Sequence, residues 1–146
     1  IQTFYPKALF TEDLDPDLDE VLRGYVEAAL WSSTDNADAS GGEPLDKNYT
    51  AADIVESLIQ SMRSDCERFI RENAADVALY ARSRKYDPVQ GTVWEYFGHD
   101  LWLNRNGHGS GFWDRDLGDL GDRLSEAARN FGSSYLYVGD DGKLYV

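Results

Sequence analysis

Two stretches in the first half of the chain place apolar residues at helical spacing, and they constrain the fold more than any other feature. In residues 16–31 and 50–73, apolar side chains recur every three or four positions, which puts them on one side of a helix. They are Leu18, Val21, Leu22, Tyr25, Val26, Ala29 and Leu30 in the first stretch, and Ile54, Leu58, Met62, Cys66, Phe69 and Ile70 in the second. Because each helix must cover its apolar side, we expect both to pack in one core.

Capping signals agree with these two helices. Asp15 supplies an oxygen that accepts hydrogen bonds from the first amide groups of a helix, and Pro16 follows where no amide hydrogen is needed. Thr50 and Asp53 have the spacing of a capping box, although aspartate is less usual there than glutamate. Further helices are expected over residues 74–82 after Asn73, from Asp87-Pro88 to about Phe97, and over residues 116–131 before Gly132.

In the last third of the chain the apolar spacing becomes that of strands. Residues 99–104, HDLWLN, alternate between two faces, and Asn106-Gly107 tolerates the positive φ angles of a tight hairpin turn. Residues 108–114 can return as the partner strand, and residues 133–146 contain a second pair of alternating runs joined by Asp-Asp-Gly. The sequence therefore predicts an α+β fold, with N-terminal helices packed on a small C-terminal antiparallel sheet made of two hairpins separated by a helix.

The chain has the size of one domain. It has 146 residues, of which 42% are hydrophobic, and this is enough to bury a core. We expect a single domain over residues 1–146. Residues 33–49 have few apolar side chains and are predicted to be a flexible surface loop.

The chain is strongly acidic. It contains 14 basic and 27 acidic residues, which give a formal net charge of -13. Residues 1–48 hold eleven acidic and three basic side chains, so more than half of the acidic excess lies there. Phosphate backbones and anionic membranes repel such a chain. We therefore expect a basic protein as partner, with no direct binding to nucleic acid or membranes.

Cys66 is the only cysteine, so an internal disulfide and a zinc site built from several thiolates are excluded. Its position in the second apolar stripe predicts a buried, unreactive thiol. No apolar run reaches the length of a membrane span. We expect a soluble protein without a cofactor in a reducing cytoplasm.

Both histidines of the chain lie in one segment with aspartates and tryptophans. One interpretation makes His99, Asp100, Trp102, His108 and Asp114 a small-ligand, metal or acid–base site on the predicted hairpin. Their spacing matches no metal-ligand or nucleophile motif, so the identity of any metal stays open. The other interpretation assigns these residues to turn, packing and capping roles. The sequence favours this structural interpretation, and therefore a protein that is not an enzyme.

Two segments of the C-terminal third carry a resemblance. GHDLWLNRNGHGSGFWDR, residues 98–115, and YVGDDGKLYV, residues 137–146, resemble a pattern shared by uncharacterised small proteins encoded by bacteriophages. The resemblance implies a viral product that acts in the cytoplasm of a bacterial host. It brings no assigned activity and no catalytic residues.

Two functional hypotheses follow. The favoured one is an acidic interaction protein that binds and inhibits a basic host nucleic-acid-binding or defence protein. Duplex DNA carries one negative charge per about 1.7 Å of axis, so a strongly acidic protein can compete for DNA-binding grooves. The partner-binding residues would be Glu12, Asp13, Asp17, Asp19 and Glu20. The alternative is a ligand or metal site around the histidines, and the sequence leaves the target and the oligomeric state open.

Overall fold

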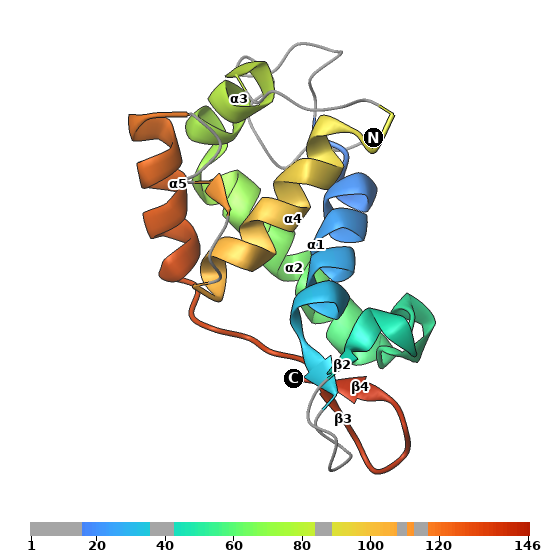
Figure 1. The fold of residues 1–146 in the computed structure, drawn as a ribbon. Coiled ribbons are helices and arrows are strands. Elements are labelled where there is room, and N and C mark those ends of the chain that lie inside the picture. The colour runs from blue at the N-terminus through green and yellow to red at the C-terminus, as the bar shows by residue number, and fades with distance from the viewer. Residues whose placement is uncertain (1–15, 36–42, 84–88, 108–110, 113–116) are drawn as a thin grey trace.

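The computed structural model describes residues 16–35, 43–83, 89–107, 111–112 and 117–146, which form five α-helices and two short antiparallel strand pairs (Figure 1). The helices are α1 (Leu18–Ser32), α2 (Glu56–Glu72), α3 (Ala74–Ser83), α4 (Val93–Arg105) and α5 (Asp119–Arg129). Two 3-10 turns, η3 (Leu45–Lys47) and η4 (Ala51–Asp53), precede α2. Strand β1 (Thr34–Asp35) pairs with β2 (Glu43–Pro44), and β3 (Tyr137–Val138) pairs with β4 (Leu144–Tyr145). The predicted α+β class and the C-terminal hairpin are confirmed.

Helix α4 lies between α1 and α5, and it packs most extensively along α1 (Figure 1). Helices α2 and α3 complete the bundle, and the strand pairs lie together at the end where the chain terminates. A parallel bridge between Ile54 and Leu144 attaches the C-terminal hairpin to the segment before α2. None of the described helices is long and apolar enough to cross a membrane.

The two predicted apolar stripes face the core. In α1, Val21 and Tyr25 are almost completely buried, while Leu18 and Leu22 lie at its edge. Cys66 of α2 is fully buried, as predicted. The core is rich in aromatic rings, which meet mainly edge to face or tilted.

The first predicted hairpin is wrong, because its residues 99–105 belong to helix α4. The alternation of residues 99–104 suggested one buried and one exposed side, but Asp100, Trp102 and Asn104 are as buried as the leucines between them. Because neighbouring elements cover α4 on several sides, its sequence lacks the single apolar stripe of a surface helix. Of the predicted return strand, residues 108–114, the structure describes two residues, which form no strand.

A capping box begins α4 and was the missed signal for this helix. Thr92 Oγ1 accepts a hydrogen bond from the Glu95 amide at 3.2 Å, and Glu95 Oε1 accepts one from the Thr92 amide at 2.9 Å. The helix thus begins at Val93 and continues well past Phe97. The predicted start at Asp87-Pro88 lies outside the described residues.

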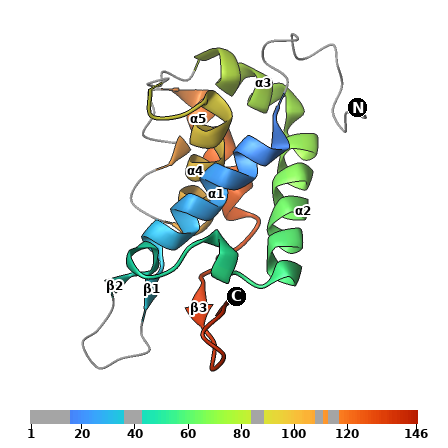
Figure 2. The same cartoon turned by 90° about the vertical axis from the view of Figure 1, so that its right-hand side faces the viewer.

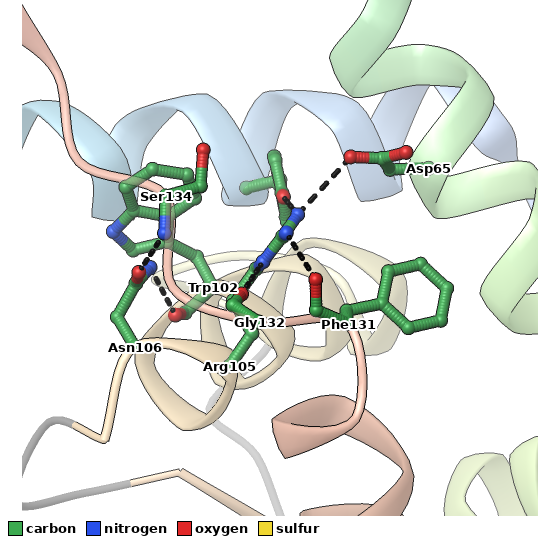
Figure 3. Close-up of polar contacts among 8 residues, drawn as sticks. Asp65, Trp102, Arg105, Asn106, Phe131, Gly132 and Ser134 are labelled. Carbon is green, nitrogen blue, oxygen red and sulfur yellow. Dashed lines mark hydrogen bonds and ion pairs between the residues drawn. The ribbon is translucent and has the colours of Figure 1, made fainter. Parts of the chain in front are cut away.

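Asn106-Gly107 forms a turn, but this turn ends α4 and does not join two strands. Gly107 has a φ of 65°, and its amide donates to the Asn104 carbonyl at 3.2 Å. The Asn106 side chain donates to the Trp102 carbonyl at 2.9 Å and accepts from the Ser134 amide at 2.6 Å (Figure 3). The turn therefore also fixes the chain that follows α5.

The cap of α1 lies two residues later than predicted, at Asp17 in place of Asp15. Asp17 caps the helix, because its Oδ1 accepts from the amides of Asp19 at 3.0 Å and Glu20 at 3.2 Å. The predicted cap, Asp15, lies outside the described residues. An acid at this position also benefits from the positive end of the helix dipole.

The segment between α1 and α2 has more structure than a flexible loop. Within residues 33–49, strands β1 and β2 pair, and Leu45 is fully buried. Residues 36–42 of the predicted loop lie outside the described residues. The Thr50 amide donates to Asp53 Oδ2 at 2.8 Å, as the capping box predicted, but the pair caps η4, and α2 begins separately after it.

Arg105, in the last turn of α4, holds several elements together (Figure 3). Its guanidinium donates to the carbonyls of Gly132 at 2.8 Å and Phe131 at 3.0 Å. It also donates to the Tyr25 hydroxyl of α1 at 2.8 Å and to Asp65 of α2 at 3.1 Å. Its side chain is only 7% exposed, so these partners replace the hydration that the guanidinium loses on burial.

The backbones of α1 and α4 touch at two glycines. A Cβ at Gly24 would collide with the Glu95 carbonyl, and a Cβ at Gly98 would collide with the Val21 carbonyl. We expect Gly24→Ala and Gly98→Ala each to lower the free energy of unfolding by at least about 3 kcal/mol, beyond ordinary overpacking, because backbone must move. Denaturant titration measures this loss. Gly91→Ala is the control, since its Cβ meets only the side chain of Glu95; an equal loss there would contradict the close approach.

Gly107 adopts a backbone conformation that side chains disfavour. We expect Gly107→Val to lower the free energy of unfolding by about 1–2 kcal/mol, because a β-branched residue is strained at positive φ. Gly107→Asn should cost less, since asparagine tolerates this conformation. Equal melting temperatures of the valine variant and the parent chain would count against the helix-ending turn.

Candidate interaction surface on helix α1

Of the acidic residues predicted to bind a partner, the structure describes three at the start of α1, and each has a different environment. Asp17 is exposed and caps the helix. The side chain of Asp19 is 73% exposed and lies 2.7 Å from Arg63 of α2 in an ion pair. Glu20 is half-buried. Glu12 and Asp13 lie outside the described residues.

Two carboxyl groups between α1 and α4 have shifted pKa values. Burial raises the pKa of Glu20, and the nearby charge of Asp17 raises it further. The pKa of Glu95 is lowered, first by the hydrogen bond from the Thr92 backbone and also by Arg23, whose Nη1 lies 3.2 Å from Glu95 Oε2. Glu95 therefore keeps its negative charge at lower pH than Glu20 does.

An apolar hollow of about 530 Å³ lies between α1, the start of η4 and α2, and we call it the α1–α2 hollow. Its apolar wall consists of Leu22, Val26 and Leu30 from α1, Tyr49 and Ala51 from the segment before α2, and Ile59 from α2. Figure 2 shows that the segment containing η3 and η4 crosses from α1 to the start of α2. Asp19 and Glu27 are acidic groups on the rim of this hollow.

A second hollow, of about 290 Å³, lies between α1 and α4, and we call it the α1–α4 hollow. It is more polar, and Glu27, Glu95, Tyr96 and His99 contribute to its lining. Glu27 lines both hollows, and Arg23 lines the first while its guanidinium bonds to Glu95 of the second. Arg23 and Glu27 therefore form a ridge between an apolar and a polar depression.

The residues of the alternative site do not converge. His99 is half-buried, with its ring centroid 5.9 Å from that of Trp31. Asp100 is buried and accepts a hydrogen bond from the Tyr80 hydroxyl at 2.8 Å. Trp102 is buried, and its indole donates to Ser32 Oγ at 2.7 Å. His108 and Asp114 lie outside the described residues.

Buried polar groups in the described part of the chain are engaged with one another. There, every buried side-chain nitrogen and oxygen has a hydrogen-bond partner. Asn104, for example, accepts from the Ser125 hydroxyl at 2.8 Å and from the Phe112 amide at 3.0 Å. Among the same described residues, no three His, Cys, Asp or Glu side chains could together hold a metal ion.

Neither hollow was predicted from the sequence. Leu22, Val26 and Leu30 belong to the apolar stripe of α1, and their spacing predicted simple burial. The hollow exists because the chain before α2 covers these side chains only in part, which depends on a contact between distant segments. The spacing of four residues between these side chains was the one signal in the sequence for this apolar wall.

No protein-family model, curated protein or solved structure matches the chain. The resemblance of residues 98–115 and 137–146 to phage-encoded proteins stays a prediction. Functional interpretation therefore rests on the geometry and charge of the described residues.

Cys66 provides a test of the buried core between α1 and α2. Burial raises the pKa of its thiol, and the charge of Asp65 adds to this. A raised pKa stabilises the fold fully below the unfolded value of 9.0, and this contribution is lost as pH rises above it. We expect thiol reagents to label Cys66 no faster than the protein opens, and we expect stability to fall from pH 9.0 upward.

The variant Cys66→Ala is the control for this titration. Tyr25 also has a pKa raised by burial, but from 10.0, so its contribution is lost only at higher pH. Between pH 9.0 and pH 10.0, the free energy of unfolding should therefore fall less in the alanine variant than in the parent chain. Denaturant titration at several pH values measures this difference. Rapid labelling without denaturant would contradict the burial.

Proposed function

We propose that this is a non-enzymatic interaction protein that binds a basic protein through the acidic outer side of α1. The carboxylates of Asp17, Asp19, Glu20 and Glu27, all at the cap of α1 or within it, carry this proposal, and the surplus of unpaired acids on the described surface supports it. Many basic residues are already in ion pairs, namely Arg23, Lys47, Arg63, Arg71, Arg105 and Arg123. Several exposed acids make no ion pair within the described part of the chain, namely Glu27, Asp46, Glu72, Asp122, Glu126 and Asp140.

This imbalance supports a basic partner. A surplus of exposed carboxylates raises the rate of encounter with positive surfaces and disfavours phosphate backbones. The target that fits this chemistry is a nucleic-acid-binding or defence protein whose basic groove the chain occupies. The phage-type pattern of the C-terminal third supports a bacterial host cytoplasm as the setting.

A small-ligand or metal function around His99 is the second candidate. It is favoured by one observation, since His99 shares the α1–α4 hollow with Glu27 and Glu95. The hairpin on which this hypothesis was built is absent from residues 99–104, which are helical. We therefore use the histidines as the contrasting variant in the functional test.

The test compares two sets of neutralised acids. Variant one carries Glu12→Gln, Asp13→Asn, Asp19→Asn and Glu20→Gln, and it leaves the Asp17 cap intact. Basic proteins retained from a bacterial lysate are identified, purified and titrated between about 50 and 200 mM salt. We expect variant one to bind about tenfold more weakly at low salt, and binding of the parent chain to fall as salt rises.

The matched control neutralises four acids away from the start of α1, through Glu72→Gln, Asp122→Asn, Glu126→Gln and Asp140→Asn. It has the same net charge as variant one, so a smaller loss of affinity there identifies α1 as the binding surface. A third chain carries His99→Gln and His108→Gln and should bind like the parent chain, because it keeps the carboxylates of Glu27 and Glu95 that attract a basic partner at the α1–α4 hollow. Loss of binding in the histidine variant, with binding kept in variant one, would replace the interaction proposal by the ligand-site proposal.

A further inference from the structure

We infer that the outer side of α1 recognises its basic partner by two side chains, a large apolar one in the α1–α2 hollow and a Lys or Arg at the α1–α4 hollow. This inference rests on the proposed function and specifies the partner segment. The two hollows share Glu27 and lie on opposite flanks of the ridge formed by Arg23 and Glu27.

The α1–α2 hollow has the properties of an anchor site. Its wall is apolar, with Val26 and Leu30 almost buried and Leu22 and Ile59 partly exposed. An apolar side chain placed there would remove the remaining exposed apolar surface from water. Anchors of this kind, in pockets with a polar rim, dominate binding at protein interfaces.

Charge complementarity identifies the second side chain. Five carboxylates, from Asp17, Asp19, Glu20, Glu27 and Glu95, surround this side of the molecule, while Arg23 and Arg63 are the nearby cations in ion pairs with two of them. The carboxylate of Glu27 is exposed and makes no ion pair with the described residues. A guanidinium or ammonium group of the partner can therefore form an ion pair with Glu27, whereas an acidic segment would be repelled.

The distance across the ridge sets the spacing in the partner. A helix with its side chains is about 10 Å across, and an extended polyproline II segment advances about 3.1 Å per residue with three residues per turn. An apolar residue and a Lys or Arg three positions apart in such a segment lie on the same side of it, about 9 Å from each other, and therefore reach the two flanks of α1 together. The geometry points to a basic, extended segment with this pairing as the occupant.

The experiment uses synthetic peptides and the full chain. The first peptide has a leucine three residues before an arginine within a Ser/Gly/Lys background. The second has the leucine replaced by serine, and the third has the two residues next to each other. Fluorescence anisotropy of labelled peptides gives the dissociation constants at low salt. We expect the first peptide to bind about tenfold more tightly than the other two.

Two pairs of variants separate this site from general acidity. Glu27→Lys and Glu72→Lys change the net charge equally, and both positions are exposed and outside any ion pair of the described residues. Ala51→Trp places a large ring at the α1–α2 hollow, and Ala75→Trp places one on the exposed side of α3. The first member of each pair should weaken binding of the first peptide about tenfold, and the second member should not.

The outcomes distinguish the inference from the function on which it rests. If all the basic peptides bind alike and both lysine variants weaken binding equally, the two-hollow site is overturned while the acidic interaction function stands. If no basic peptide binds even at low salt, the proposed function fails as well.

Concentration-dependent dimerisation abolished by Ala51→Trp would assign the hollow to a second copy. Binding that appears only after removal of residues 1–15 would assign it to the chain itself, and either result overturns the inference.

Discussion

The contact between the backbones of α1 and α4 at Gly24 and Gly98 determines where the other elements can lie. With no side chain at these two positions, the helices lie close enough for the rings of Tyr25 and Trp102 to meet edge to face, with centroids 5.1 Å apart. This approach brings Arg105 at the end of α4 within hydrogen-bond distance of the Tyr25 hydroxyl. The same guanidinium then fixes α2 through Asp65 and the chain after α5 through two carbonyls. The close packing of α1 and α4 therefore fixes the positions of α2 and of the chain after α5.

The same contact also shapes the outer side of α1. One side of the helix is held tightly against α4, whereas the side towards α2 is joined by fewer contacts and by the exposed ion pair of Asp19 with Arg63 at 2.7 Å. Exposed ion pairs contribute only about 0–1 kcal/mol to stability. The Arg23 side chain is 60% exposed in its ion pair with Glu95, and Glu27 makes no ion pair with the described residues, so these two ridge residues contribute little to stability. Binding at this surface can change without loss of the bundle.

The sequence was sufficient for the elements that have one apolar face or a local turn signal. Helices α1, α2, α3 and α5 and the hairpin around Asp140-Asp141 follow from local patterns, and the burial of Cys66 follows from its stripe. Helix α4 was misread because it is buried on several sides, so that alternating residues looked like a strand. The glycine contact and the α1–α4 hollow join segments more than sixty positions apart, and the α1–α2 hollow joins α1 to residues 49–59; no local pattern encodes such contacts. The acidic start of α1 was found from the sequence, while the apolar half of the candidate site was not.

The fold and the proposed binding make opposite demands on charge. The bundle depends on a buried cation, Arg105, and on acids such as Asp17 and Glu95 that cap helix starts, where the helix dipole favours them. Exposed acids such as Glu27, Glu72 and Glu126 make no ion pair among the described residues, and within a net charge of -13 they add repulsion between parts of the fold. Salt screens that repulsion and so favours the folded chain, but it also screens attraction to a basic partner. The proposed partner would use both features of this side of α1, because its basic groups would offset the repulsion between the acids and its apolar side chain would fill the α1–α2 hollow.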